Sequence, residues 1–325
     1  MRSYVLAATC LGSFLVLGAC GVGEEETSGT EEAARGGRWK KDAGTTTDGS
    51  TNTDAATTTD AGTTTDASTP PSSYTCGPVS VGSGCPSVAG PNGESGYYAP
   101  SFSSNSNGYN TYVSNQDLGI NGTQSLWANG PGSWKIVSNI TDDGGRVQTF
   151  PDAQQLYDTT GAGNFPLSGF PALKVNYDET SPGGTANHYQ FSPDVFFSNY
   201  ANDVMFWVDV NGRCDEGSYG PSLLGHFTMP DGSGWTAHRY DDSSITTGNT
   251  GAEIILIKDG PGGQGTCAQE HSGVIDVKAG LAWLSSHGFL PAVPTLSILQ
   301  TGWEITQSSN ATFTVNSMSY VDTFN

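Results

Sequence analysis

The feature that most constrains the fold is residues 202–209, whose alternating pattern predicts a β-strand with two different faces. The face that suits a core carries Val204, Phe206 and Val208. The opposite face carries Asp203, Met205, Trp207 and Asp209. A strand that only met solvent would more often carry Thr, Ser or Lys, so two carboxylates beside a thioether and an indole indicate the floor of a cleft.

A second alternating stretch, residues 298–304, lies near the C-terminus and carries Gln300, Gly302 and Glu304 on one face. Two carboxylates that converge from two strands, with aromatic surface between them, are the arrangement that hydrolysis of a glycosidic bond requires. We therefore expect Asp203 and Glu304 to face each other across the cleft.

The N-terminus predicts export. Arg2 precedes an apolar run over residues 5–17 that is too short to span a bilayer. The ending of this run, Leu17-Gly18-Ala19-Cys20, resembles the bacterial lipobox, which implies a lipid on Cys20. We expect residues 1–20 to be a lipoprotein signal peptide, and Gly21 favours the outer membrane or cell surface as the anchoring site. An ordinary signal peptide, with secretion of the protein, is the alternative.

Two regions follow the signal peptide. Residues 21–75 are rich in Thr, Asp and Gly and almost lack branched or aromatic side chains, which predicts a disordered linker. Residues 76–325 fit one large β domain, which we expect to be monomeric. The formal net charge of −20 argues against a nucleic-acid partner, because phosphates need cationic contacts.

Four cysteines belong to the domain, since Cys10 falls in the signal peptide and Cys20 would carry the lipid. Four cysteines allow three pairings, and we favour Cys76 with Cys85 and Cys214 with Cys267. A zinc site is the alternative, but neither a CxxC spacing nor a nearby histidine supports it. The five histidines also lack metal-ligand spacing, so we expect no metal site and no cofactor.

Strand-like runs recur from residue 109 to residue 320, separated by Gly, Asn and Asp. One helix is predicted over residues 276–287, with Asp276 as its N-cap and Gly288 as its stop. Glu253, on the otherwise apolar run 253–258, is interpreted as a surface residue. Many short strands and one covering helix predict an all-β fold, a two-sheet β-sandwich (jelly roll) whose inner sheet curves into a concave cleft.

The domain resembles glycoside hydrolase family 12, the jelly-roll endoglucanases and xyloglucanases. The family's nucleophile strand reads Glu-(Val/Ile/Leu)-Met-(Ile/Val)-Trp-Leu, and here Asp203-Val-Met205-Phe-Trp207-Val stands in its place. Its acid/base strand and the segment after it resemble Gln300-Thr-Gly302-Trp-Glu304 and Val315-Asn316-Ser317-Met-Ser319-Tyr. Residues 125–129 and 147–151 also match family segments in order and spacing, so the resemblance covers most of residues 109–321.

The resemblance implies a retaining mechanism, with Glu304 as the acid/base and Asp203 at the nucleophile position. It also implies that Met205, Trp207 and Gln300 contact sugar rings. The same is implied for Asn115, in the segment Asn115-Gln-Asp-Leu118-Gly119. Asp194 is the candidate for the acidic helper residue that precedes the nucleophile strand in the family.

Two departures from the family pattern bear on activity. The nucleophile position holds Asp instead of Glu, and the family's distal Trp has no counterpart near Leu118. The expected function is an endo-acting β-1,4-glucan hydrolase of cellulase or xyloglucanase type on the cell surface, with β-glucan polysaccharide as its partner. The alternatives are a catalytically weakened relative that acts as a glycan-binding surface lipoprotein, and an adhesion domain without a carbohydrate ligand.

Overall fold

The computed structural model describes residues 74–85, 88–89, 95–96, 111–158, 163–197, 202–212, 214, 222–240, 253–291 and 293–325. The expected signal peptide with Cys20, and the expected linker up to residue 73, lie outside the described residues. Tyr74 and Thr75 contact the domain: Lys135 Nζ lies 5.5 Å from the centre of the Tyr74 ring, and the Thr75 backbone N–H donates to Asn129 Oδ1 at 3.0 Å. Within the described ranges, no helix has the length and apolar character needed to cross a membrane.

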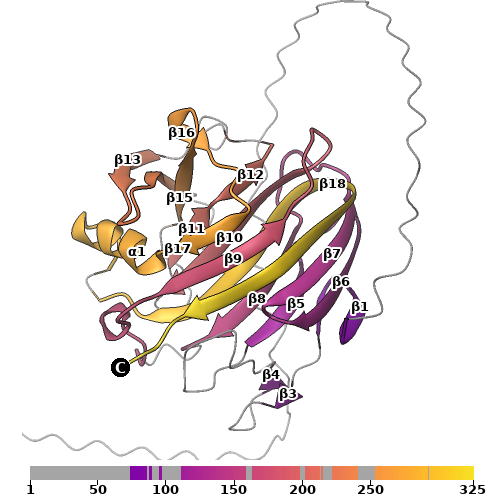
Figure 1. The fold of residues 1–325 in the computed structure, drawn as a ribbon, viewed down its shortest axis with the longest axis horizontal. Helices are drawn as coiled ribbons and strands as arrows, with labels where there is room; N and C mark the ends of the chain where they lie inside the picture. Colours follow the sequence, from indigo (N-terminus) through magenta and orange to yellow (C-terminus); the bar gives the residue numbers. More distant parts are fainter. Residues whose placement is uncertain are drawn as a thin grey trace, which may run out of the picture.

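The strands form two layers that share one long strand, β18 (Leu296–Val321), as Figure 1 shows. Sheet A contains, in spatial order, β1 (Cys76–Ser80), β6 (Gly122–Gly130), β7 (Ser133–Ile140), the C-terminal half of β18, β9 (Lys174–Thr180) and β17 (Ser272–Ile275). Sheet B contains β2 (Ser83–Gly84), β5 (Thr111–Asp117), β8 (Thr149–Leu156), the N-terminal half of β18, β10 (His188–Phe197), β11 (Asn202–Trp207), β15 (Glu253–Gly260), β14 (Gly234–Tyr240) and β13 (Ser222–Thr228).

Shorter elements complete the fold. They are β12 (Asp209–Asn211) beside β10, β16 (Gly263–Cys267) beside β15, the pair β3 (Val88–Ala89) and β4 (Ser95–Gly96), and the 3-10 turn Leu167–Gly169. Disulfides join Cys76 to Cys85 and Cys214 to Cys267, with Cα–Cα distances of 5.8 Å and 5.7 Å. The expected β-sandwich and the favoured cysteine pairing are both confirmed.

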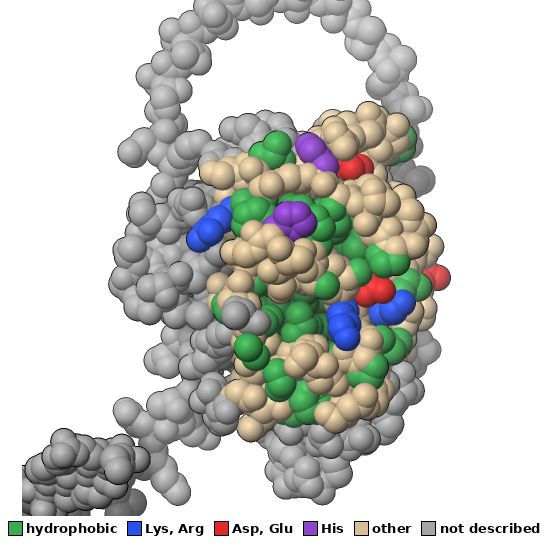
Figure 2. Space-filling view, turned by 90° about the vertical axis from the view of Figure 1, so that its left-hand side faces the viewer, with side chains coloured by type: hydrophobic (Ala, Val, Ile, Leu, Met, Phe, Trp, Pro, Cys, Tyr) green, Lys and Arg blue, Asp and Glu red, His purple; other side chains and the backbone are tan. Residues whose placement is uncertain are grey.

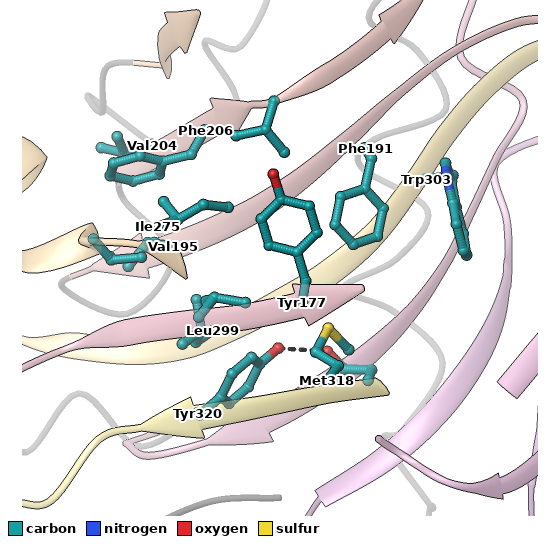
Figure 3. Packing of buried hydrophobic residues seen from close by; sticks show 14 of the residues in the cluster. Tyr177, Phe191, Val195, Val204, Phe206, Ile275, Leu299, Trp303, Met318 and Tyr320 are labelled. Atoms are coloured by element: carbon teal, nitrogen blue, oxygen red, sulfur yellow. Dashed lines mark hydrogen bonds between the residues drawn. The ribbon is translucent and has the colours of Figure 1, made fainter. Parts of the chain in front are cut away.

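Alternate side chains of sheet B fill the space between the sheets. Figure 3 shows this packing for Phe191, Val195, Val204, Phe206, Leu299 and Trp303 of sheet B with Tyr177, Ile275, Met318 and Tyr320 of sheet A. The buried Trp303 ring lies 5.1 Å from Trp134 and 5.0 Å from Phe191. Burying such a side chain contributes about 1.5–3 kcal/mol. The apolar face of β11 is thus confirmed as a core face, so its other face points away from sheet A.

Helix α1 (Val277–Ser286) confirms the predicted helix and its cap. The Asp276 carboxylate accepts a hydrogen bond from the Ala279 N–H at 3.1 Å, which satisfies a donor without a partner inside the helix. Gly288 follows the helix at φ 75°, a left-handed conformation that glycine adopts without strain. A Cβ on Gly280 would lie 2.5 Å from the Phe206 ring, so the helix packs closely against the core face of β11.

The side of the molecule that carries α1 and β13 is partly apolar at its surface, as Figure 2 shows. Leu223 of β13 is 54% exposed. Phe227 of β13 stacks on Trp283 of α1 with their ring centroids 4.5 Å apart. These contacts join the helix to the edge strand of sheet B.

Candidate active site

The outer face of sheet B, which points away from sheet A, carries five buried carboxylates among the described residues. They come from five adjacent strands and are Asp152 (β8), Glu304 (β18), Asp194 (β10), Asp203 (β11) and Glu253 (β15). Their exposed fractions lie between 0% and 7%. Because buried carboxylates are costly unless they are paired or used, this face is the candidate active site.

The strand register does not bring Asp203 beside Glu304. Asp203 pairs with Phe196 on β10, and Phe196 pairs with Ile298 on β18, whereas Glu304 pairs with Gln190. Glu304 therefore lies six residues farther along β18 than the position level with Asp203, and six residues of strand span about 20 Å. The two residues share a face, and this register offsets them along it.

The carboxylate nearest to Glu304 across a strand pair is Asp152. Asp152 pairs with Gly302, two residues before Glu304, so the two acids are diagonal neighbours. In antiparallel sheets such neighbours have Cβ atoms about 7–8 Å apart or slightly less. No sequence motif pointed to Asp152, which lies in the middle of β8 (Thr149–Leu156). A polar residue that continues the alternation beyond Pro151 is the signal that would have found it.

Gln190 holds the Glu304 side chain. Its Nε2 donates to Glu304 Oε2 at 2.8 Å, and Gln190 itself is half-buried. Between the two acids, Gly302 is required by a close approach, because a Cβ there would lie 2.0 Å from the Pro151 carbonyl oxygen. This glycine thus lets β8 and β18 come together at the point where Asp152 and Glu304 are held.

Asp203 has different acidic neighbours. It pairs directly with Glu253 on the parallel strand β15, and Asp194 is its diagonal neighbour on β10. The interpretation of Glu253 as a surface residue was wrong, since it is only 3% exposed. Asp194 accepts a hydrogen bond from the Ser192 hydroxyl at 2.8 Å. The proposed helper residue thus lies near Asp203, as expected, but both are remote from Glu304.

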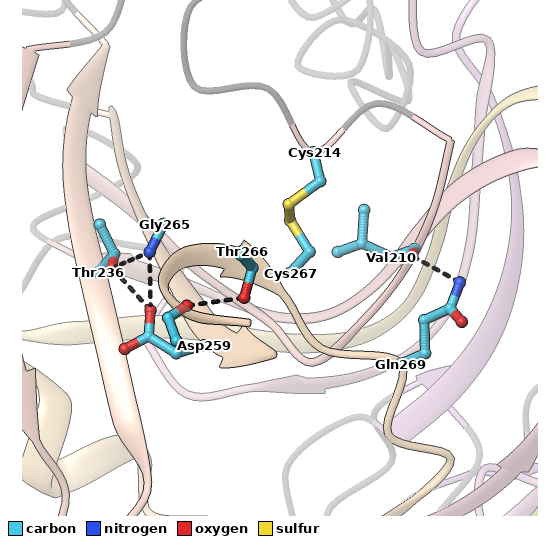
Figure 4. The surroundings of a disulfide bond; sticks show 9 residues. Val210, Cys214, Thr236, Asp259, Gly265, Thr266, Cys267 and Gln269 are labelled. Atoms are coloured by element: carbon cyan, nitrogen blue, oxygen red, sulfur yellow. Dashed lines mark hydrogen bonds between the residues drawn. A yellow bond between two sulfur atoms is a disulfide. The ribbon is translucent and has the colours of Figure 1, made fainter. Parts of the chain in front are cut away.

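Met205, Trp207 and Gln300 occupy the outer face between the two acidic regions. Met205 and Trp207 form a small apolar cluster with Val210, Ile255 and Ile257 that is separate from the main core. The disulfide Cys214–Cys267 packs against this cluster (Figure 4). Two buried polar atoms here have no hydrogen-bond partner, Trp207 Nε1 and Gln300 Oε1. Hydroxyl groups of a ligand would satisfy both atoms.

Asn115 does not belong to this face, which corrects the expectation of a sugar contact. Its Nδ2 donates to the Val79 carbonyl oxygen at 3.0 Å, and its Oδ1 accepts from Gln124 Nε2 at 2.6 Å. Val79 and Gln124 belong to sheet A, so the Asn115 side chain lies between the sheets and is fully buried. The alternation in β5 places Ser114 and Gln116, not Asn115, on the outer face.

Asp209 also points inward, which corrects its expected place beside Asp203. Met205 pairs with Asp194, and Asp209 pairs with Phe191. Between these two pairs, the strand with Asp209 contains one residue more than β10. Such a bulge at Val208 shifts the alternation by one and moves the following side chain to the other face. Asp209 is accordingly 0% exposed.

A hollow of about 400 Å³ opens at the far end of the same sheet, away from the acids. It is lined by residues of β13 to β16, including His226, Thr228, Asp259 and Gln264. The Thr236 hydroxyl links two of its sides, because it donates to Asp259 Oδ1 at 2.7 Å and lies 2.9 Å from His226 Nδ1.

The fold is a β-sandwich of the kind found in family 12 glycoside hydrolases. Trichoderma harzianum endoglucanase 3 from this family superposes with a TM-score of 0.51 and 17% identity over 65% of this chain and 90% of its own. The catalytic domain of Humicola grisea Cel12A, solved with a thio-cellotetraose, gives 0.53 and 16% over 65% of this chain and 92% of its own.

A xyloglucanase domain shows the same likeness. It is that of Sinorhizobium fredii NopAA, solved with cellobiose, and gives a TM-score of 0.50 and 20% identity over 69% of this chain and 97% of that domain. No family model matches the chain, and neither does any curated protein sequence. At such identities the likeness shows a common fold.

Proposed function

We propose that the chain is an endo-acting β-1,4-glucan hydrolase of cellulase or xyloglucanase type that acts on the outer face of sheet B. The observation that supports it best is the row of five buried carboxylates on adjacent strands of a glycoside-hydrolase fold. An acid and a second carboxylate on either side of the scissile bond are the groups that this chemistry needs. The chain carries a formal net charge of −20, which suits a neutral glucan better than an anionic polymer.

Glu304 is the proposed acid/base. In a retaining mechanism it protonates the departing glycosidic oxygen, and after the partner carboxylate has attacked the anomeric carbon it removes a proton from water. The hydrogen bond from Gln190 to Oε2 orients the Glu304 carboxyl group toward its task.

Asp152 takes the place of Asp203 as the partner of Glu304 in this proposal. Working pairs hold their carboxyl groups about 5 to 9.5 Å apart. Diagonal neighbours reach this range, whereas residues offset by about 20 Å along the strands do not. Trp207 and Gln300 are the proposed sugar contacts, since each has a buried polar atom without a partner.

Reducing-sugar release from carboxymethylcellulose, xyloglucan and mixed-linkage glucan tests the proposal. The native chain should release sugar from at least one of these polymers, and E304Q should not, because Gln keeps the shape of the side chain but cannot donate a proton as an acid. Equal release by both proteins, or no release by the native chain, refutes hydrolysis.

Glycan binding without hydrolysis is the second candidate, and the register of β11 favours it. The residue that stands at the motif's nucleophile position, Asp203, is Asp instead of Glu and lies far from Glu304. Retarded migration in gels that contain xyloglucan, with no sugar release, would support this candidate. W207A should then abolish the retardation, because it removes an aromatic ring and a buried N–H that sugar hydroxyls would satisfy.

We also propose that the chain is exported and anchored by a lipid on Cys20. The lipobox-like ending of the apolar segment supports this, and so does the oxidised state of four cysteines, which is typical of exported proteins. Metabolic labelling with a fatty acid tests it. C20S should lose the label, whereas a label that persists in C20S contradicts lipidation at this residue.

A further inference from the structure

Three ionisable side chains that no sequence spacing connects meet between the two sheets. Glu179 comes from β9, Asp209 from β12, and His271 from the segment between β16 and β17. Their nearest carboxylate and imidazole atoms all lie within 4.8 Å of one another. His271 Nδ1 is 2.7 Å from Glu179 Oε1 and 3.4 Å from Asp209 Oδ2.

Asp209 is the unusual member of this cluster. Its side chain is fully buried, and neither carboxylate oxygen has a hydrogen-bond partner. His271 Nδ1 lies 3.4 Å from its Oδ2, and the Ser181 and Tyr189 hydroxyls lie beside it. A fully buried carboxylate costs free energy unless its charge is balanced, so the cluster has a place for a cation.

The backbone holds the three side chains firmly. The Glu179 N–H donates to the His271 carbonyl oxygen at 2.8 Å, and Asp209 forms a bridge with Gln269. Gln269 Nε2 also donates to the Val210 carbonyl oxygen at 3.2 Å, and the Cys214–Cys267 disulfide lies just before this segment (Figure 4). Residues 267–271 therefore connect sheet B to sheet A at the cluster.

We propose that Glu179, Asp209 and His271 bind a divalent transition metal ion, with Zn²⁺ as the preferred ion. Two carboxylates and one imidazole form a mixed oxygen and nitrogen ligand set, which suits Zn²⁺ better than Ca²⁺ or Mg²⁺. Three protein ligands leave the fourth coordination position for a water molecule. Water can enter beside His271, whose side chain is 52% exposed.

The present distances are close to those of a bound ion. Zinc–ligand bonds of about 2.0–2.2 Å in a tetrahedron separate the ligand atoms by about 3.4 Å. The distance between His271 Nδ1 and Asp209 Oδ2 already has this value, and the atoms of Glu179 and His271 need to part by less than 1 Å. Ser181 would orient the bound carboxylate, because its hydroxyl donates to Glu179 Oε2 at 2.5 Å.

Metal titration of the full chain, purified without a histidine tag and dialysed against EDTA, tests the proposal. ZnCl₂ should bind with one-to-one stoichiometry in calorimetry and raise the melting temperature by several degrees. The same additions of MnCl₂ and CaCl₂ rank the selectivity. Absence of binding by all three ions, or a preference for Ca²⁺, overturns the proposal.

Variants locate the ion. D209N and H271A should each reduce Zn²⁺ affinity at least tenfold, and H271A is expected to fold because His271 lies at the surface. D178N on the same strand and H287A elsewhere on the surface are matched controls and should bind as the native chain does. Zn²⁺ binding that survives both D209N and H271A would assign the ion to another place and contradict this site.

Discussion

The two acidic regions on the outer face of sheet B differ in how their carboxylates meet. Asp152 and Glu304 are diagonal neighbours on antiparallel strands, and half-buried Gln190 holds Glu304. Asp203 and Glu253 stand directly opposite each other on parallel strands, in a row that continues into the buried apolar residues Phe196 and Ile298. Both regions come from the same sheet face, so their difference arises from register alone.

A strand motif therefore predicts which face of the sheet a residue lies on, but not which residue of the neighbouring strand lies next to it. Like charges directly opposite each other in a sheet repel and leave no space between them for a substrate. Diagonal neighbours such as Asp152 and Glu304 leave such a space. We therefore expect catalysis to depend on the Asp152 and Glu304 region, and stability or binding to depend on the Asp203 region.

The largest expected effect separates the two regions directly. E304Q should lower kcat on the preferred glucan by at least about a hundredfold, the usual size of a lost general acid. D203N should lower it by less than about tenfold, because Asp203 is too far away to touch the same bond. Steady-state kinetics on both variants measure this. A loss in D203N as large as that in E304Q would restore Asp203 as the partner of Glu304.

The next effect tests which acid completes the pair. D152N should lower kcat by about a hundredfold or more, since it removes the second carboxylate from the reacting centre. E253Q is the matched control from the Asp203 region and should keep kcat within about tenfold of the native value. If E253Q is inactive and D152N is not, the assignment of the two regions is reversed.

The sequence predicted the faces of the strands well but not their pairing. Alternation alone assigns Val204 and Phe206 to the core and Gln300, Gly302 and Glu304 to the outer face, because the period of two is local. Register depends on contacts between residues a hundred positions apart, such as Gln190 with Glu304, which no local pattern contains. The alternation therefore placed Asp203 and Glu304 on one face but did not contain their offset along the strands.

The bulge at Val208 shows the same limit at a single residue. One extra residue turned Asp209 from the outer face to the interior, where it meets Glu179 and His271. These three residues come from three separate segments, so the interior cluster had no sequence signal. By contrast, the cap at Asp276 and the stop at Gly288 were predictable, because both depend on neighbours within a few residues.

A smaller effect tests the close approach that shapes the Asp152 and Glu304 region. G302A should destabilise the fold by about 1–3 kcal/mol, because the new methyl group would overlap the Pro151 carbonyl oxygen and push β8 away from β18. Urea unfolding measures it. G183A is the control, since nothing lies within 4 Å of a Cβ there, and it should change the free energy of unfolding by less than about 0.5 kcal/mol. Equal stabilities of the two variants would show that the strands part without cost.

The smallest effect concerns the side chain that orients Glu304. Q190A removes the hydrogen bond to Glu304 Oε2 and should lower kcat about two- to tenfold, because the carboxyl group stays in place but samples more orientations. Q264A is the matched control, because Gln264 is exposed and lies on β16, which is not adjacent to β18. Activity measured at saturating glucan separates orientation from binding, since a pure binding defect would raise KM and leave kcat unchanged. A kcat for Q190A equal to the native value would mean that Glu304 is positioned by the strand alone, and the contrast between the two acidic regions would then depend only on distance.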